Sequence, residues 1–374
     1  MKKIRILQFP ISNSKGGITQ YILQNWKFID RTKFHFDFAT MSRELDFLDE
    51  LKQTGSNVYY ISCYAEENEK KFVEEFKKIL IEGEYDIIHL HTKQWKSFLI
   101  EKIAKEVGVK RIIIHAHSTG IDTLDIQKRK LEIYMHNNTK KYLTENIATD
   151  YWACSWKAAD FIFGNQIPIQ KIKIMKNAID LSKFKYNEKN RNKCRKKLGI
   201  NNEFVIGNIG RLVYQKNQEF LLEVFKNICK NDKDKDYILL LVGAGERMYE
   251  YKSLSKRMGL EDKVIFTGHR TDVPDLLQAI DIFCLPSRFE GLPIGLIEAQ
   301  ASYLPCIASD SITDEVVINH NVDLLPLDAK LWETKIVEYS YNKYNRNNKN
   351  ASLEKSGYDI RRQIKYVEKS YFSE

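Results

Sequence analysis

The sequence predicts an α/β protein of two similar domains, each built on a parallel sheet and facing the other across a cleft. Short apolar runs of strand character alternate with amphipathic segments along the chain. The alternation starts afresh after a basic, polar break at residues 177–203. The length of 374 residues also exceeds what one hydrophobic core usually covers.

The strands of the first half are predicted at the runs KIRILQFP, FHFDFATM, NVYYIS, DIIHLHT, RIIIHAHS and YWACS. Residues 67–81 and 96–107 have apolar spacings of three or four, which are typical of helices. Such alternation predicts a parallel sheet with helices on both faces and a binding crevice at the carboxyl ends of its strands.

The second half repeats this pattern in FVIGNIGRL, YILLLVGAG, VIFTGH, IDIFCLPS and LPCIASDS. We therefore expect an N-terminal domain at residues 1–180 and a C-terminal domain at residues 181–352. The tail, residues 353–374, contains an amphipathic helix that we expect to pack back on the N-terminal domain.

Residues 281–301 contain a predicted strand, loop and helix that carry two candidate site residues. An apolar run predicts a buried strand, a polar turn follows at 287–291, and Pro293 suits the first turn of a helix. Glu290 falls in the loop and Glu298 about a turn and a half along the helix. The helix N-terminus suits a phosphate, and two carboxylates can accept hydrogen bonds from the hydroxyls of a sugar and a ribose. Two glutamates at this spacing are usually surface residues. Whether these two belong to a site therefore depends on the segments around them.

The segment GNIGRLVYQKN follows a predicted strand and leads into a helix. Arg211 offers a planar fork of donors and Lys216 a point charge, which are two complementary ways to neutralise a diphosphate. Cations at the start of a helix are mildly disfavoured by its dipole. This local conflict favours a functional role over an ordinary surface position.

Gly16 and Gly17 follow the first predicted strand and precede a helix. Adjacent glycines let backbone N–H groups approach an anion closely. Many first turns of this type are glycine-rich for steric reasons alone, so the signal is weak in isolation.

Two predicted strands end in alternating histidines, His89 and His91 in one and His115 and His117 in the other. Alternate residues on a strand share a face, so each pair should point one way, toward the rim of the crevice. A third ligand at metal-binding spacing is missing, which makes a metal site the weaker interpretation. We expect His117 to contact substrate, and His89 and His115 to have structural roles.

Several other function classes are disfavoured. The glycines at 243 and 245 lack the third glycine of a dinucleotide fingerprint, because Met248 stands there. The acidic run Asp232–Asp236 precedes its strand and alternates with lysines, so it is interpreted as a solvated turn. Six scattered cysteines contain no C-x-x-C pair and fit buried thiols. Tyr134, Tyr142 and Trp152 are interpreted as core or interface residues.

The net charge of +9 favours anionic partners such as nucleotides or lipid headgroups. Basic clusters at 70–78, 127–130 and 185–197 are interpreted as solvated faces, with attraction to an anionic membrane as the alternative. No nucleic-acid-binding motif is present, so no nucleic-acid partner is expected.

The motifs GRLVYQKN, TGHRTDVPDLLQAIDIFCLPS and FEGLPIGLIEAQASYLPCIASD together resemble the retaining glycosyltransferases of family 4. Those enzymes have two Rossmann-like domains (the GT-B fold), and Glu290 and Glu298 match their E-x7-E motif. KGGITQY, RIIIHAHS, ACSWKAADFIFG and NAIDLSKF extend the resemblance over nearly the whole chain. The pattern is especially similar to enzymes of bacterial capsule and exopolysaccharide assembly.

The resemblance implies roles for the matching residues. Arg211 and Lys216 would hold the donor diphosphate, Glu290 the transferred sugar and Glu298 the ribose. The amides around Gly291 and Leu292 would support these contacts. Gly16 and Gly17 would approach the phosphate, and His117 would contact the sugar. No bound metal or other cofactor is expected, because the cations supply the electrostatic stabilisation. Two departures are Asn177-Ala178, where many relatives carry Asn-Gly, and the doubled histidines, which leave His115 and His117 both open.

The resemblance implies transfer of a hexose or N-acetylhexosamine from a nucleotide sugar, which we expect to be UDP-linked, to a lipid-linked or polysaccharide acceptor. We expect a cytoplasmic enzyme, peripheral at the inner face of the cell membrane. Two alternatives stay open. One is another GT-B enzyme such as an epimerase, and the other is a non-catalytic subunit that binds a sugar nucleotide.

Overall fold

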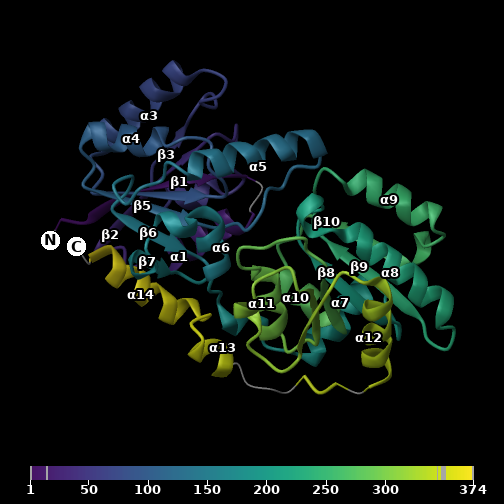
Figure 1. The fold of residues 1–374 in the computed structure, drawn as a ribbon. Coiled ribbons are helices and arrows are strands. Elements are labelled where there is room, and N and C mark those ends of the chain that lie inside the picture. Colours follow the sequence, from purple (N-terminus) through teal and green to yellow (C-terminus); the bar gives the residue numbers. More distant parts are fainter. Residues whose placement is uncertain (1, 14–15, 343, 347–350, 373–374) are drawn as a thin grey trace. The chain divides into compact units, whose positions relative to one another are not determined.

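The computed structural model describes residues 2–13, 16–342, 344–346 and 351–372 (Figure 1). Their contacts divide the chain into two compact units. Unit 1 consists of Met1–Ile121, Gln127–Ala178 and Ile360–Glu374, and unit 2 consists of Asp122–Ile126 and Ile179–Asp359. Within these ranges no helix of the described residues is long and apolar enough to cross a membrane.

Unit 1 contains a parallel sheet that the described residues form from seven strands, in the order β3-β2-β1-β4-β5-β6-β7. Helices flank this sheet (Figure 1). Its elements are β1 (Ile4–Ile11), α1 (Gly17–Phe28), β2 (Phe34–Thr40), α2 (Leu48–Lys52), β3 (Val58–Tyr60), α3 (Glu69–Gly83), β4 (Ile87–Thr92), α4 (Leu99–Val107), β5 (Arg111–Ala116), α5 (Ile126–Lys140), β6 (Asp150–Ala153), α6 (Trp156–Ile162), β7 (Ile172–Ile174) and α14 (Ile360–Phe372).

The predicted strands of the first half are confirmed as β1 to β6, because their apolar runs supply side chains to both faces of a covered sheet. The predicted helices at 67–81 and 96–107 correspond to α3 and α4. The strand β7 was not predicted. It has three residues, all of them only partly buried, and it lies at the edge of the sheet, so its apolar signal is weak.

The last helix, α14, is part of the core of unit 1. Its residues Ile364, Val367 and Tyr371 are buried in the same apolar cluster as Phe34 and Phe36 of β2. Its strong amphipathic pattern follows from this position, because one face is covered and the other is exposed. The last turn of α14 therefore packs beside the first strands of the chain, and the two chain ends lie near each other (Figure 1).

Unit 2 contains a second parallel sheet, formed in the described residues by six strands in the order β10-β9-β8-β11-β12-β13. Its elements are α7 (Glu188–Leu198), β8 (Phe204–Ile209), α8 (Gln218–Asn231), β9 (Tyr237–Val242), α9 (Met248–Arg257), β10 (Val264–Gly268), α10 (Val273–Ala279), β11 (Ile282–Leu285), α11 (Ile294–Ala301), β12 (Cys306–Ser309), β13 (Val322–Leu325), α12 (Ala329–Tyr341) and α13 (Ala351–Lys355).

The predicted strand, loop and helix at 281–301 are confirmed as β11 and α11, with Pro293 at the N-cap of the helix. The edge strand β13 was not predicted, because its sequence VDLL is short and interrupted by a charge. All six cysteines are free thiols, four of them buried.

Each sheet reverses its strand order once, between β1 and β4 in unit 1 and between β8 and β11 in unit 2. Ligands of doubly wound sheets bind outside the carboxyl ends of the strands at such a reversal. Gly16 follows β1, and Arg211 and Glu290 follow β8 and β11. Gly16, Arg211 and Glu290 therefore follow strands at the reversal points of their sheets, whereas His117 follows β5, one strand further along.

Candidate active site

The site of unit 2 is built on the loops that follow two adjacent strands. β8 and β11 pair through Ile206 and Ile282, so their carboxyl ends lie side by side. The loop after β8 carries Arg211 and then Lys216, the latter in a single 3₁₀ turn, Tyr214–Lys216. The loop after β11 carries Glu290. Lys216 and Glu290, which are 74 positions apart in the chain, therefore meet at one edge of the sheet.

Lys216 and Glu290 form a close ion pair. Nζ of Lys216 lies 2.5 Å from Oε1 of Glu290, and their side chains are only 16% and 8% exposed. The hydroxyl of Ser287 donates to the same oxygen at 2.7 Å, and Nε2 of Gln215 donates to Oε2 at 3.1 Å. A buried carboxylate is stable only when its oxygens are paired in this way.

Gln215 fixes the relative position of the two loops. Its Nε2 also donates to the carbonyl of Phe289 at 2.9 Å, while its own backbone carbonyl accepts from the amide of Arg288 at 2.8 Å. Backbone and side chain of one residue thus hold the loop of Glu290 against the loop of Lys216. This role could not be predicted from the sequence, because Gln215 alone matches no chemical motif.

Arg211 is held by a different carboxylate. Its guanidinium donates to Oδ2 of Asp122 at 3.0 Å, and the amide of Gln215 donates to Oδ1 of the same residue at 3.0 Å. Asp122 belongs to the short segment 122–126 that is assigned to unit 2. Sequence reasoning missed it, because it lies 89 positions before Arg211 and outside any motif.

The glycines at 243 and 245 support the loop of Arg211. A Cβ at Gly243 would meet the carbonyl oxygen of Gly210, and one at Gly245 would meet the carbonyl oxygen of Leu212. The two loops are also joined by a hydrogen bond from the amide of Leu212 to the carbonyl of Ala244, at 3.0 Å. These glycines therefore permit a close approach of two backbones.

A buried polar chain holds the other side of the same loop. Nε2 of Gln218 donates to the carbonyl of Arg211 at 3.0 Å and to Oδ1 of Asn208 at 3.2 Å. Nδ2 of Asn208 donates to the carbonyl of Cys284 at 2.8 Å. Both amides are fully buried. These hydrogen bonds link β11, β8 and the start of α8, and they hold the Arg211 loop in place from inside the unit.

Glu298 lies on α11 and is partly exposed. Burial of the carboxyl raises its pKa to about 8, while the positive charge of Lys216 acts in the opposite direction. Lys216 is thus electrostatically coupled to both glutamates of the predicted pair. The raised pKa favours the protonated form of the Glu298 carboxyl, which can donate as well as accept a hydrogen bond.

The remaining predicted residues of unit 2 lie in the same loop. Gly291 and Leu292 follow Glu290 directly and are buried just before α11. In unit 1, Gly16 is the N-cap of α1 and Gly17 is its first residue, with open space where a Cβ would stand. Both glycines therefore have the helix-start position that was expected from the sequence.

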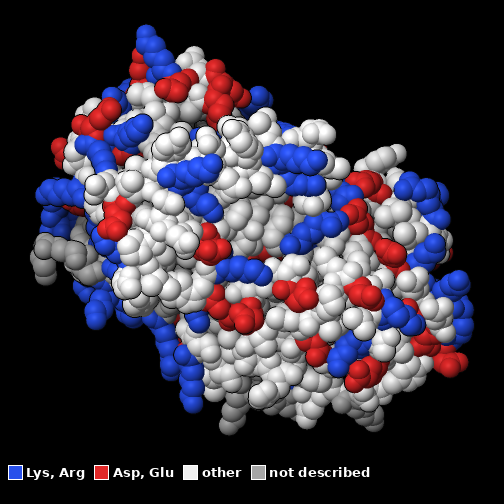
Figure 2. All heavy atoms as spheres, viewed as in Figure 1, with Lys and Arg blue, Asp and Glu red and all other residues white. Residues whose placement is uncertain are grey.

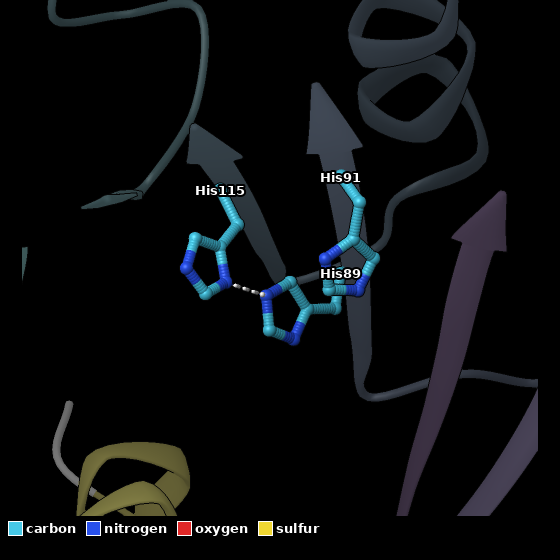
Figure 3. A group of neighbouring side chains, drawn as sticks. All are labelled: His89, His91 and His115. Atoms are coloured by element: carbon cyan, nitrogen blue, oxygen red, sulfur yellow. Dashed lines mark hydrogen bonds between the residues drawn. The ribbon is translucent and has the colours of Figure 1, made fainter. Parts of the chain in front are cut away.

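The histidines of β4 and β5 form one cluster in unit 1 (Figure 3). Nitrogens of His89, His91 and His115 all lie within 4.8 Å of one another. These three side chains are at most 4% exposed, whereas His117 is partly exposed at the end of β5. The expectation that each pair points toward the rim is therefore wrong for His89, His91 and His115, because these rings are buried against side chains of α1 and α14 such as Tyr21 and Tyr371.

Hydrogen bonds connect the cluster. Nε2 of His89 lies 3.2 Å from Nδ1 of His115, and Nδ1 of His91 lies 2.9 Å from Nε2 of His117. Burial lowers the pKa of His117 to about 3, with Lys93 adding to the effect. Burial likewise lowers the pKa values of the other three, and neighbouring histidines add to it. The rings are therefore neutral at physiological pH.

Comparison with known proteins identifies the family. Residues 190–365 match the family model of "Glycosyl transferases group 1". The chain is 25% identical over 343 residues to the Escherichia coli UDP-Gal:alpha-D-GlcNAc-diphosphoundecaprenol alpha-1,3-galactosyltransferase, covering 86% of this chain and 83% of that protein. It is 26% identical over 341 residues to the capsular polysaccharide biosynthesis glycosyltransferase CapH of Staphylococcus aureus, covering 89% and 90%.

The fold is also that of solved glycosyltransferase structures. The crystal structure of HepE from Anabaena, in complex with UDP and glucose, matches with a TM-score of 0.78 at 18% identity and covers 100% of both chains. This likeness confirms the predicted α/β architecture with two parallel sheets. The chain belongs to the group 1 glycosyltransferases of the GT-B fold, is homologous to enzymes of capsule and exopolysaccharide synthesis, and is itself a glycosyltransferase.

Proposed function

We propose that this enzyme transfers a hexose or N-acetylhexosamine from a UDP-linked donor to a lipid-linked or polysaccharide acceptor, with retention at the anomeric carbon. The observation that carries the proposal is the pair formed by Lys216 and Glu290 at the reversal point of the unit 2 sheet. The choice of nucleotide is supported by the relatives, since HepE was crystallised with UDP-glucose and the E. coli relative is named for UDP-Gal.

Charge compensation is the central step of this proposal. Negative charge grows on the diphosphate as the bond between sugar and phosphate breaks. Arg211 and Lys216 are each held by a carboxylate, at 3.0 and 2.5 Å, so their positions are set before the donor arrives. Cations that need no reorganisation stabilise developing charge most effectively.

The remaining groups would orient the donor. We assign the transferred sugar to Glu290 and the ribose to Glu298, with the amides of Gly291 and Leu292 beside them. Gly16 and Gly17 would approach the phosphate through the N-terminus of α1. His117 would accept a hydrogen bond from a sugar hydroxyl through a neutral ring.

A donor screen tests this function. The purified chain is incubated with UDP, GDP and ADP sugars and an undecaprenyl-diphosphate-linked GlcNAc acceptor, and labelled products are separated. We expect transfer from one UDP sugar and thermal stabilisation by UDP. Recovery of an epimerised donor without transfer would support the epimerase alternative. Binding of UDP with no turnover of any donor would support the non-catalytic alternative.

The acceptor side of the proposal concerns α5. Only His136 of this 15-residue helix is buried, and the ring is held by Trp95 and Phe161. Leu131 and Tyr134 are 57% and 67% exposed. Tyr134 and Tyr142 are therefore not core residues, which leaves the interface interpretation for both, while Trp152 is fully buried as expected. Helix α5 presents large apolar side chains to solvent.

Basic residues accompany this apolar surface. Residues 124–142 contain five lysines and arginines and two acidic residues, a net charge of +3. Figure 2 shows Lys and Arg side chains separated by uncoloured surface along α5. Basic residues are attracted to an anionic membrane surface, and exposed apolar side chains beside them gain from burial in it. We therefore propose that the enzyme is peripheral at the cytoplasmic face of the membrane and docks through α5, where a lipid-linked acceptor would be met.

A further inference from the structure

Hydrogen bonds join the histidine cluster to β1 near the start of the chain and to α14 near its end. Gln8 of β1 and Tyr371 of α14 contact each other, with Nε2 of Gln8 donating to the Tyr371 hydroxyl at 3.2 Å. Oε1 of Gln8 lies 2.8 Å from Nε2 of His91, and the Tyr371 hydroxyl lies 2.7 Å from Nδ1 of His89. Gln8 and Tyr371 are at most 4% exposed, so water does not compete with these bonds.

Each bond in this set fixes the next, because a neutral imidazole has one donor and one acceptor nitrogen. The carbonyl of the Gln8 amide can only accept, so His91 must carry its proton on Nε2. Nδ1 of His91 is then an acceptor and must receive the proton of His117 Nε2. Nδ1 of His117 is left with a free lone pair.

The second branch runs the same way. The Tyr371 hydroxyl accepts from Gln8, and we direct its single proton to Nδ1 of His89, which lies 2.7 Å away. His89 then donates from Nε2 to Nδ1 of His115. This leaves a proton on Nε2 of His115, a buried nitrogen with no hydrogen-bond partner of normal geometry among the described residues. Of the four rings, only His117 is partly exposed.

We propose that Gln8, His91 and Tyr371 are positioning residues that lock one tautomer of His117, with the proton inward on Nε2 and the lone pair of Nδ1 offered to a hydroxyl of the bound sugar. The proposal rests on the proposed function only for the identity of that hydroxyl. The locked tautomer itself follows from the contacts. Reversing the Gln8 amide would reverse both branches and turn His117 Nδ1 into a donor, so Gln8 is the residue that sets the direction.

A metal ion shared by His89, His91 and His115 is the competing explanation for the cluster. Both ring nitrogens of His89 and of His91 already have hydrogen-bond partners, at 2.7–3.2 Å. A metal would have to replace several of these bonds, and no carboxylate is part of the group. The hydrogen bonds that join Gln8, Tyr371 and the four histidines (the relay) account for the same nitrogen atoms without a metal ion.

The tautomer can be measured directly by ¹⁵N NMR of histidine-labelled protein, with the His117 signals assigned through His117→Gln. We expect a pyridine-type nitrogen at Nδ1 and a pyrrole-type nitrogen at Nε2. Gln8→Met removes both amide contacts, and we expect a mixture of tautomers. Gln8→Glu keeps an acceptor for His91, so the wild-type signals of His117 should return. Gln363→Met, a substitution of a buried glutamine on α14 outside the relay, is the matched control.

Kinetics supply the second readout. We expect Gln8→Met and Tyr371→Phe to lower kcat/KM by about tenfold, whereas Tyr366→Phe on the exposed side of α14 leaves it unchanged. Gln8→Met should cost little more once His117 is already glutamine, because the effect passes through that ring.

Several results would overturn the relay. These are a wild-type His117 with its proton on Nδ1, additive losses in the double variant, or purified protein that holds one equivalent of zinc and loses it in His89→Ala. Gln8 is buried, so circular dichroism of each variant must first show native folding, and Tyr371→Phe serves where Gln8→Met does not fold. The NMR readout needs no turnover, so a wrong proposed function would leave the tautomer result intact.

Discussion

Nζ of Lys216 lies 2.5 Å from Oε1 of Glu290, and this pair joins the loops after two adjacent strands. The relationship makes each residue depend on the other. Without Glu290 the largely buried ammonium would lose the carboxylate paired with it. Without Lys216 the carboxylate would keep the neutral donors Ser287 and Gln215 but lose this positive charge. The pair is therefore both a structural link and a poised charge for an incoming phosphate.

We predict that Lys216→Ala lowers kcat by about 10²–10³-fold, as does the loss of one preorganised donor in other enzymes. The loss should appear mainly in kcat, because the charge on the diphosphate is greatest in the transition state. Steady-state transfer assays measure it. Lys226→Ala, an exposed lysine on α8, is the control. Near-normal transfer by Lys216→Ala would remove the diphosphate role.

Asp122 is predicted to matter through Arg211. Asp122→Ala removes the acceptor for the guanidinium and for the amide of Gln215, so the Arg211 side chain should become mobile. Because the pair is partly exposed, we expect a loss of about five- to tenfold in kcat/KM rather than a complete loss. The exposed Asp236→Ala is the control in the same unit. An unchanged kcat/KM would show that Arg211 needs no partner for its position.

Glu298 predicts a pH dependence of stability. Its pKa is raised from 4.5 to about 8 in the folded state, so the native protein binds this proton more tightly than the unfolded chain does. The contribution is fully present below pH 4.5 and is lost as the pH rises to about 8. The full shift corresponds to at most about 5 kcal/mol, which partial exposure reduces.

Glu298→Gln should therefore raise the free energy of unfolding more at pH 8.5 than at pH 5, as measured by urea titration. Glu223→Gln, an exposed residue on α8, should show no such difference. A Glu298→Gln variant with the same pH slope as the wild type would mean that this carboxyl titrates normally.

Gly245 is predicted to tolerate no side chain. In Gly245→Ala the new methyl group would meet the carbonyl of Leu212 and push the Arg211 loop away. We expect a loss of about 1–3 kcal/mol in the free energy of unfolding and a higher KM for the donor. Ala244→Ser, in the same loop but exposed, should leave both quantities unchanged. Chemical denaturation and donor kinetics check the two effects separately.

The sequence predicted those parts of the structure that have a local signal. Apolar runs located the longer strands, and they placed Arg211 and Glu290 in loops that follow predicted strands. The sequence could not predict the roles of Asp122, Gln215 and Gln218, because these roles depend on which loops meet in space. The short edge strands β7 and β13 carried too few apolar residues to stand out.

The burial of the histidines also could not be predicted from the sequence. Their alternation correctly placed each pair on one face of its strand, but periodicity could not tell which face α1 and α14 would cover. That information lies in residues about 280 positions away, as in the contact of His89 with Tyr371. Burial, and with it the lowered pKa values, is a property of the folded chain only.

The last prediction concerns α5 and the membrane. Leu131→Ser combined with Tyr134→Ser removes two exposed apolar side chains but no charge. Burying such side chains in a bilayer surface contributes about 1.5–3 kcal/mol each, so we expect binding to phosphatidylglycerol vesicles to weaken at least tenfold. Cosedimentation measures the binding, and transfer to a short water-soluble acceptor should be unchanged. The control pair is Tyr60→Ser with Ile81→Ser, both exposed in unit 1 and away from α5. Equal loss in the control pair would mean a general change in surface polarity, and retained binding in the α5 variant would mean that another surface meets the membrane.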